Sequence, residues 1–180
     1  LEVPTGGGCF PAELDLMTWN IGGKFGLVKA KDCRLGMELL SFGDNEFKPS
    51  KVLVCKKHSG VFEMVRIYGL MYPHITTLYY DEPQLRMLFN VRRPNERLIA
   101  DTCVTQNHPI WIRNRGEIKA GRVQVGDILD ELVIDHGDII NIGINIINVE
   151  KFTYIGDVYD IKTEKKRLYS RYLLGHTYKT

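Results

Sequence analysis

Several features that mark other protein classes are missing from this sequence of 180 residues. Its four cysteines form no CxxC pair and no dense framework, so neither a zinc-finger pattern nor a disulfide scaffold is indicated. No apolar stretch approaches the ~18 residues of a membrane span, and the N-terminus lacks a signal-peptide pattern. The net charge of +2 is too small to indicate nucleic-acid binding. We therefore expect a soluble, intracellular and cytoplasmic protein that binds neither nucleic acid nor a membrane.

Helical periodicity is also weak, whereas strand patterns are frequent. Short segments rich in β-branched and aromatic residues alternate with glycine, asparagine or aspartate turns. They predict strands over residues 50–57, 61–69, 97–105, 109–114, 130–135, 144–152, 157–163 and 169–175. The best helical candidates are a turn or two at VKAKDC and at IKAGRV. With 44% hydrophobic residues, the chain is predicted to form one all-β domain.

The two candidate turns belong to an internal repeat. VKAKDCRLGMELL (28–40) aligns without a gap on IKAGRVQVGDILD (118–130), at an offset of 90 residues. A second echo follows each copy, where GVFEMV (60–65) resembles GDVYDIK (156–162). A spacing this long does not fit a solenoid, whose period is about 20 to 50 residues. The repeat predicts two related halves and a compact β-structure with pseudo-twofold symmetry.

The stretch TGGGCF (5–10) places a cysteine directly after three glycines. Cysteine is the strongest common side-chain nucleophile near neutral pH, and a free thiol is a few per cent thiolate at pH 7. Glycines allow the backbone to enter a tight site, but they also suit a linker. Cys9 is therefore a candidate nucleophile, and the peptide before it is either its target or a plain tether.

Further polar residues are predicted at strand ends. In CVTQNHPIWI (103–112), Thr105 and His108 fall where a strand breaks before Pro109. His176 lies in LLGHT near the end of the sequence. From spacing alone, each histidine is more often a turn or surface residue than a catalytic one.

Taken in order, these segments resemble the Hint superfamily, which contains inteins, bacterial-intein-like domains and Hedgehog autoprocessing domains. CFPAELDL with KAKDCRLGMELLSF is similar to the first block of that family, and VTQNHPIW to the second. GDVYDIKT resembles the penultimate block and YLLGHT the last. Four motifs in the family order, together with the internal repeat, imply the horseshoe-like Hint β-fold, most like a bacterial-intein-like domain.

The resemblance implies a chemistry for the opening stretch. Cys9 would attack the carbonyl of Gly8, so that an N-to-S acyl shift turns the Gly8–Cys9 peptide into a thioester. His108 would protonate the leaving amide nitrogen, for which an imidazole with a pKa of ~6.5 is suited. Thr105 would orient the scissile peptide or His108, and Asp160 would steer the thiol proton or hold a charged intermediate.

The C-terminal motif departs from the splicing pattern. An intein normally ends in His-Asn, and cyclisation of the Asn releases the downstream segment. Here His176 is followed by Thr177, which cannot form the succinimide. Arg167 also stands roughly where many inteins carry another histidine. Either the Asn has been replaced or the chain is a natural variant limited to N-terminal chemistry, so we expect cleavage at Thr177 to be impaired.

The same resemblance predicts how the chain is organised. Residues 1–8 would be an upstream flanking tail, 9–177 the autoprocessing domain and 178–180 a downstream tail. Residues 68–97 would be extra material within the fold. A Gly-Gly ending is how ubiquitin-like modules present their reactive terminus, so the partners expected are the flanking segments, ubiquitin-like ones among them. Water, small thiols or amines would accept the acyl group, in a monomer that needs no cofactor.

Two alternatives stay open from the residues. Cys9, His108 and His176 offer a thiolate and two imidazoles, a donor set that suits an inhibitory or regulatory zinc ion, with Asp160 or Cys103 as further ligands. The chain could instead be an inert β-domain used for protein contacts.

Overall fold

The computed structural model describes residues 8–20, 24–43, 46–71, 98–135, 138–165, 167–169 and 175–177. Almost all of this chain is extended, in agreement with the all-β prediction. The strands are β1 (Phe10–Pro11), β2 (Asp15–Asn20), β3 (Lys24–Lys29), β4 (Glu38–Gly43), β5 (Glu46–Met71), β6 (Leu98–Thr105), β7 (Pro109–Ile112), β8 (Gly116–Lys119), β9 (Ile128–Asp135), β10 (Asp138–Thr163), β11 (Arg167–Tyr169) and β12 (Gly175–Thr177). In this part of the chain no helix is long and apolar enough to cross a membrane.

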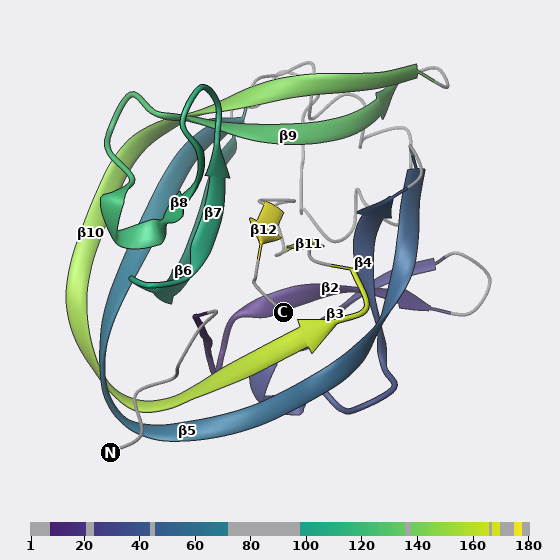
Figure 1. Cartoon of the computed structure of the whole chain (residues 1–180), viewed down its shortest axis with the longest axis vertical. Coiled ribbons are helices and arrows are strands. Elements are labelled where there is room, and N and C mark those ends of the chain that lie inside the picture. The colour runs from purple at the N-terminus through teal and green to yellow at the C-terminus, as the bar shows by residue number, and fades with distance from the viewer. Residues whose placement is uncertain are drawn as a thin grey trace.

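Strands β5 and β10 form a long two-stranded ribbon that connects the two halves of the sheet. Each has 26 residues, and they pair antiparallel from Val52 with Thr163 to Leu70 with Asn145. Figure 1 shows this ribbon curving around the outside of the molecule, with the remaining strands attached at its two arms. The sheet order is β3-β2-β4-β5-β10-β9-β7-β8, while β1 pairs with β10 and β6 with β5. The short segments that carry Cys9 and Thr105 are thereby fixed along one long ribbon.

The expected breaks near residues 60 and 156 do not occur, so the prediction of separate strands there is wrong. Gly60 and Gly156 lie opposite each other in the β5–β10 ladder, and pairing continues on either side of them. Their φ angles are 157° and 156°, values that only glycine adopts readily. The glycines therefore bend the ribbon where the sequence predicts turns.

The two halves are related by a repeated hydrogen-bond pattern, as the internal repeat predicts. The 3₁₀ turns η1 (Ala30–Asp32) and η2 (Ala120–Arg122) begin at matching alanines, both of which are fully buried. The N–H groups of Gly36 and Gly126 donate to equivalent carbonyls, those of Val52 and Ile146. These bonds show the pseudo-twofold symmetry directly.

The second sequence echo lies along the paired ribbon. Gly60 and Gly156, the first residues of the two echoed segments, are antiparallel partners in the β5–β10 ladder. The segments 60–65 and 156–162 therefore start at the same rung and run from it in opposite directions, as two strands related by a pseudo-twofold axis do.

The C-terminal segment forms a small hairpin of its own. β11 pairs with β12, Leu168 lies opposite His176, and Tyr169 lies opposite Gly175. A single strand over 169–175 is therefore wrong, because its two ends pair with each other. β11 contacts β2 and β4, whereas β12 contacts β7. Figure 1 shows the hairpin between the two arms of the curved sheet.

The predicted extra segment at 68–97 is described only in part. Residues 68–71 belong to the end of β5, and 98–105 form β6, which pairs with that same end. Residues 72–97 lie outside the described chain.

Buried side chains form a large cluster and a smaller one beside it. The large cluster joins both halves and includes Leu16, Met17, Leu39, Ile112 and Ile161. The smaller cluster consists of Cys9, Phe62, Met64, Cys103 and Val158. The first cysteine is thus packed into apolar surroundings contributed by β5, β6 and β10.

Ile161 and Ile155 offer a direct test of this core on one strand. Ile161 is 1% exposed and Ile155 is 80% exposed. We expect Ile161→Ala to lower the free energy of unfolding by about 2–5 kcal/mol, since it removes buried methyl groups and leaves a cavity. Ile155→Ala should cost less than about 1 kcal/mol. Urea unfolding of both variants checks this, and equal losses would contradict the assignment of Ile161 to the core.

Candidate active site

Cys9 lies immediately before β1, on the inner side of the long ribbon. The pairing of Phe10 with Tyr159 attaches this segment to β10. The Cys9 side chain is fully buried, in contact with Met64, Cys103 and Val158. The candidate nucleophile therefore sits in a dry, apolar pocket.

Thr105 holds the Gly8–Cys9 peptide by its amide nitrogen. The N–H of Cys9 donates to Thr105 Oγ1 at 2.8 Å. The N–H of Thr105 donates in turn to the carbonyl oxygen of Cys9 at 3.0 Å. Thr105 is itself buried, so these bonds are shielded from water. Together they fix the scissile nitrogen predicted from the sequence.

Gly8 lies directly against the backbone of His108. Its φ is +73°, in the left-handed region that favours glycine. A Cβ atom at Gly8 would lie 2.5 Å from the Cβ and 2.8 Å from the nitrogen of His108, and nearer still to its Cα. No side chain fits in that space. The glycine is therefore required both by backbone angle and by this close approach.

His108 is fully buried and is held from both sides of its backbone. Its N–H donates to the Thr105 carbonyl at 3.0 Å, and its own carbonyl accepts from Ala120 at 2.7 Å. The imidazole ring packs against Phe10, with ring centroids 4.9 Å apart at an angle of 59°. The structure thus brings Gly8, Cys9, Thr105 and His108 together, although they are about 100 residues apart in sequence.

The Cys9 thiol is strongly disfavoured as a thiolate. Burial, reinforced by the negative charge of Asp160, raises its pKa to about 12, and the positive charge of Lys162 opposes the shift. At pH 7 the thiol is therefore protonated in almost every molecule. The few per cent expected for a free thiol is therefore wrong for this site. Deprotonation must accompany any attack by Cys9.

Asp160 and Lys162 form a pair beside the thiol. Lys162 Nζ lies 3.9 Å from Asp160 Oδ2, with both side chains largely covered. They are two residues apart on β10, so their side chains lie on the same face of the ribbon. Val158, which contacts Cys9, lies on that face too. The sequence analysis missed Lys162, although the period-two spacing from Asp160 was a signal.

His176 and Thr177 are described through their backbone alone. Both belong to β12, which contacts β7, the strand that begins directly after His108. The fold therefore brings the C-terminal motif to the strand adjoining the His108 motif. Arg167 pairs with Thr177 in the small hairpin.

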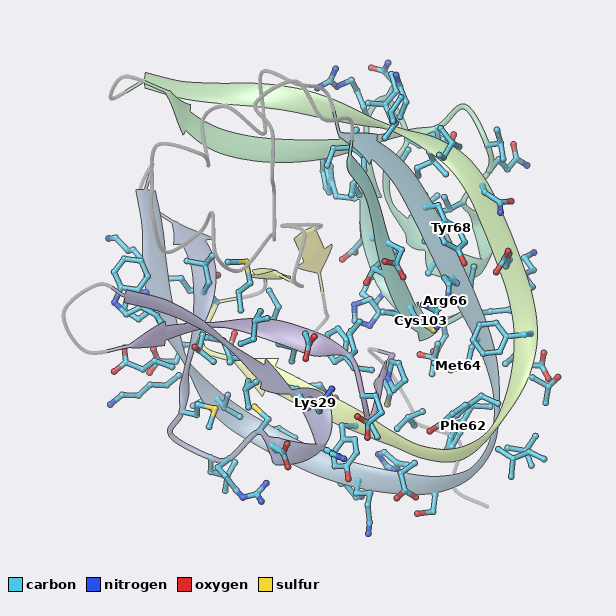
Figure 2. The ribbon with its side chains drawn as sticks, turned by 180° about the vertical axis from the view of Figure 1, so that it is seen from behind. Lys29, Phe62, Met64, Arg66, Tyr68 and Cys103 are labelled. Carbon is cyan, nitrogen blue, oxygen red and sulfur yellow. The ribbon has the colours of Figure 1, made fainter. Side chains whose placement is uncertain are left out.

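A cavity of about 370 Å³ opens beside the buried Cys9 cluster. It shares Met64 and Cys103 with that cluster, and it is also lined by Glu13, Asp15, Arg66 and Asp101. Figure 2 shows Met64, Arg66 and Cys103 close together where β5 meets β6. Arg66 Nη1 forms an ion pair with Asp101 Oδ2 at 2.8 Å. Glu13 and Asp15 form ion pairs with Lys29 and Lys31, so each carboxylate of the lining has a cationic partner.

The described side chains include no group of three or more His, Cys, Asp or Glu placed to hold a metal ion. The zinc set predicted from the sequence includes His176, whose side chain lies outside that description. Zinc binding at Cys9, His108 and His176 thus stays a prediction.

No protein-family model and no curated protein sequence matches this chain. Solved structures do match it over nearly its whole length. An intein from a hyperthermophile aligns with a TM-score of 0.66 and 13% identity, covering 95% of this chain and 99% of the other. The DnaX mini intein from Spirulina platensis aligns with a TM-score of 0.56 and 16% identity, covering 94% and 96%.

A bacterial intein-like domain from Clostridium thermocellum is also similar. Its TM-score is 0.55 at 15% identity, covering 95% of this chain and 98% of that domain. Likeness at such low identity concerns the fold. With the paired long strands and the pseudo-twofold symmetry, it establishes that the chain has the all-β, horseshoe-like Hint fold, as the sequence predicted.

Asp160 and Lys162 should shift the reactivity of Cys9 in opposite directions. Asp160→Asn removes a charge that raises the Cys9 pKa, so alkylation of Cys9 at a fixed, mildly alkaline pH should be several-fold faster. Lys162→Met removes a charge that lowers this pKa, so alkylation should be slower. Asp157→Asn, on the same strand, is the control. The measurement is iodoacetamide labelling of the tryptic peptide 1–24; acceleration by both site variants would indicate mere loosening and contradict the electrostatic assignment.

Proposed function

We propose that this chain is a self-processing domain of the protein-splicing type, acting once on its own backbone. Cys9 attacks the carbonyl carbon of Gly8, and the Gly8–Cys9 peptide becomes a thioester by an N-to-S acyl shift. The fold shared with inteins and a bacterial intein-like domain supports this class of chemistry. The zinc-binding and inert-module alternatives have no comparable support among the described residues.

One observation carries the proposal: the close packing of Gly8 on His108. It leaves no room for a side chain at Gly8 and places an imidazole-bearing residue against the peptide to be broken. Thr105 holds the nitrogen of that same peptide at 2.8 Å. Such fixed geometry is what an intramolecular attack requires, because orientation alone can account for a large share of the rate.

The proton balance of the step can be followed atom by atom. The sulfur–carbon bond forms as Cys9 Sγ loses its proton, and the carbon–nitrogen bond of the peptide breaks as the Cys9 nitrogen gains one. His108, in its imidazolium form, gives its proton to the nitrogen and becomes neutral. The Asp160 carboxylate, whose charge acts on the Cys9 thiol, takes the thiol proton and becomes neutral. The net charge of the site is unchanged.

The thioester then passes its acyl group to an acceptor, which is water, a small thiol or an amine. Cys9 is fully buried, so the acceptor needs a way in. The acceptor would enter through the cavity lined by Met64 and Cys103, the two side chains that this cavity shares with the Cys9 cluster. Transfer releases the upstream segment ending at Gly8, and flanking segments, ubiquitin-like ones included, are the partners we expect.

The C-terminal step is expected to be slow or absent. His176 lies on β12, which contacts the strand that follows His108, so the C-terminal motif is close to the His108 motif. Thr177 stands where an intein normally has the Asn whose side-chain amide forms the succinimide. Cleavage after the upstream glycine would therefore be the main outcome.

Hydroxylamine tests the thioester directly, because it cleaves thioesters at neutral pH and leaves peptide bonds intact. Mass spectrometry of the treated full chain should show residues 1–8 released as a hydroxamate. Cys9→Ala should abolish release, and His108→Ala should slow it by about 10²–10⁴, the usual share of a general acid. Cys55→Ala is the thiol control and should cleave normally. Release from the Cys9→Ala chain would overturn the proposal.

Gly8→Ala tests the close approach to His108. The added Cβ cannot fit, so the peptide must move and cleavage should slow by about 10². Gly116→Ala is a matched control, since Gly116 has the same φ of +73° but open space around its Cβ position. Gly116→Ala therefore introduces the same strain at a positive φ but makes no contact with Gly8 or His108. Equal cleavage rates for the two variants, measured with hydroxylamine, would contradict the role given to this contact.

A further inference from the structure

Cys33 and Cys55 lie together in the structure, away from the Gly8–Cys9 peptide. Cys33 follows η1, whereas Cys55 is in the middle of β5, opposite Ile161 of β10. The Cys55 thiol donates a hydrogen bond to the Cys33 carbonyl at 3.2 Å. The Cys55 sulfur thus lies against the backbone of Cys33, close enough for the two side chains to approach each other as a disulfide requires.

The surroundings of the pair favour reaction at Cys55. Cys55 is partly exposed, whereas Cys33 is 1% exposed. Burial raises the pKa of the Cys33 thiol to about 12. Burial also raises the pKa of Cys55, but the guanidinium of Arg34 counteracts this. Arg34 is held in place by a 3.0 Å bond from its Nη1 to the Cys33 carbonyl. A partly exposed thiol beside an arginine is the more reactive kind.

Cys9 and Cys103 provide the contrast within the same chain. Both are buried in the smaller cluster, Cys9 fully and Cys103 with 3% exposure. Burial raises the pKa of Cys103 to about 11. A thiol-reactive reagent in solution should therefore react with Cys55 before the three buried cysteines.

We propose that Cys33 and Cys55 form a redox-active dithiol, which closes to an intramolecular disulfide when it meets a small-molecule disulfide such as oxidised glutathione. The Cys55 thiolate attacks one sulfur of the oxidant and expels the first small thiolate. Cys33 then attacks the Cys55 sulfur of the mixed disulfide and expels the second. Two electrons pass from the protein to the oxidant, and the two thiol protons end on the released thiols.

The disulfide would join η1 to β5, two elements that hold the segment around Cys9 in place. η1 is bonded to the chain just after Cys9, through Lys31 N–H to the Ala12 carbonyl at 3.1 Å and Ala30 N–H to the Leu14 carbonyl at 2.9 Å. The residue after Cys55 on β5 pairs with Asp160. A Cys33–Cys55 disulfide would therefore link the turn η1 covalently to the β5–β10 ribbon that carries Asp160. The inference does not depend on the acyl shift.

Peptide mapping of the full chain tests the dithiol, because trypsin places each cysteine in a separate peptide. Cys33 falls in 32–34, Cys55 in 52–56, Cys9 in 1–24 and Cys103 in 98–113. After incubation with oxidised glutathione, the intact mass should drop by two hydrogens. Peptides 32–34 and 52–56 should migrate as one species until a reductant is added. The melting temperature should rise by about 5–10 °C, because a loop of some twenty residues has been closed.

The outcomes are distinct from those of the acyl-shift test. Cys55→Ser alters a partly exposed position, should fold, and should lose both the mass change and the rise in melting temperature. Cys103→Ser is the matched control and should keep both. Four free thiols after oxidation, glutathione retained on Cys55, or a link between peptides 1–24 and 98–113 would each overturn the proposal.

Discussion

The contact between Gly8 and His108 is the constraint on which the arrangement of the site depends. It requires a residue without a side chain at Gly8, and it brings the leader peptide against a strand end about 100 residues away. Thr105 secures both partners, because its side chain accepts from the Cys9 nitrogen and its backbone carbonyl accepts from His108. The peptide is thus held by an apolar pocket, two backbone bonds and one hydroxyl.

The pseudo-twofold symmetry explains how the chain builds this site. The carbonyls of Leu14 and His108 accept from Ala30 and Ala120, the first residues of the two equivalent turns. His108 therefore occupies in the second half the place that Leu14 occupies in the first. One copy of the motif supplies an apolar side chain to the core, and the other supplies an imidazole-bearing residue beside the Gly8–Cys9 peptide. The halves share a scaffold but differ in chemistry.

The sequence predicted some of these features and could not predict others. Alternating apolar residues indicated the strands, and the offset of 90 residues between Ala30 and Ala120 indicated the paired turns. The continuity of β5 and β10 through Gly60 and Gly156 was missed, because a glycine that bends a ribbon and one that ends a strand look alike in sequence. The raised pKa of Cys9 depends on burial and on charges from β10, which only the fold brings together.

The pairing of β5 with β10 also governs the order of events during synthesis. Residues 52–70 pair with 145–163 along β10, so nearly all of the domain has to leave the ribosome before the ribbon can close. Pairings so distant in sequence make folding slow. The pocket around Cys9 includes Val158, and it is therefore incomplete on a nascent chain. The topology thus delays completion of the pocket around the Gly8–Cys9 peptide until the second half has been translated.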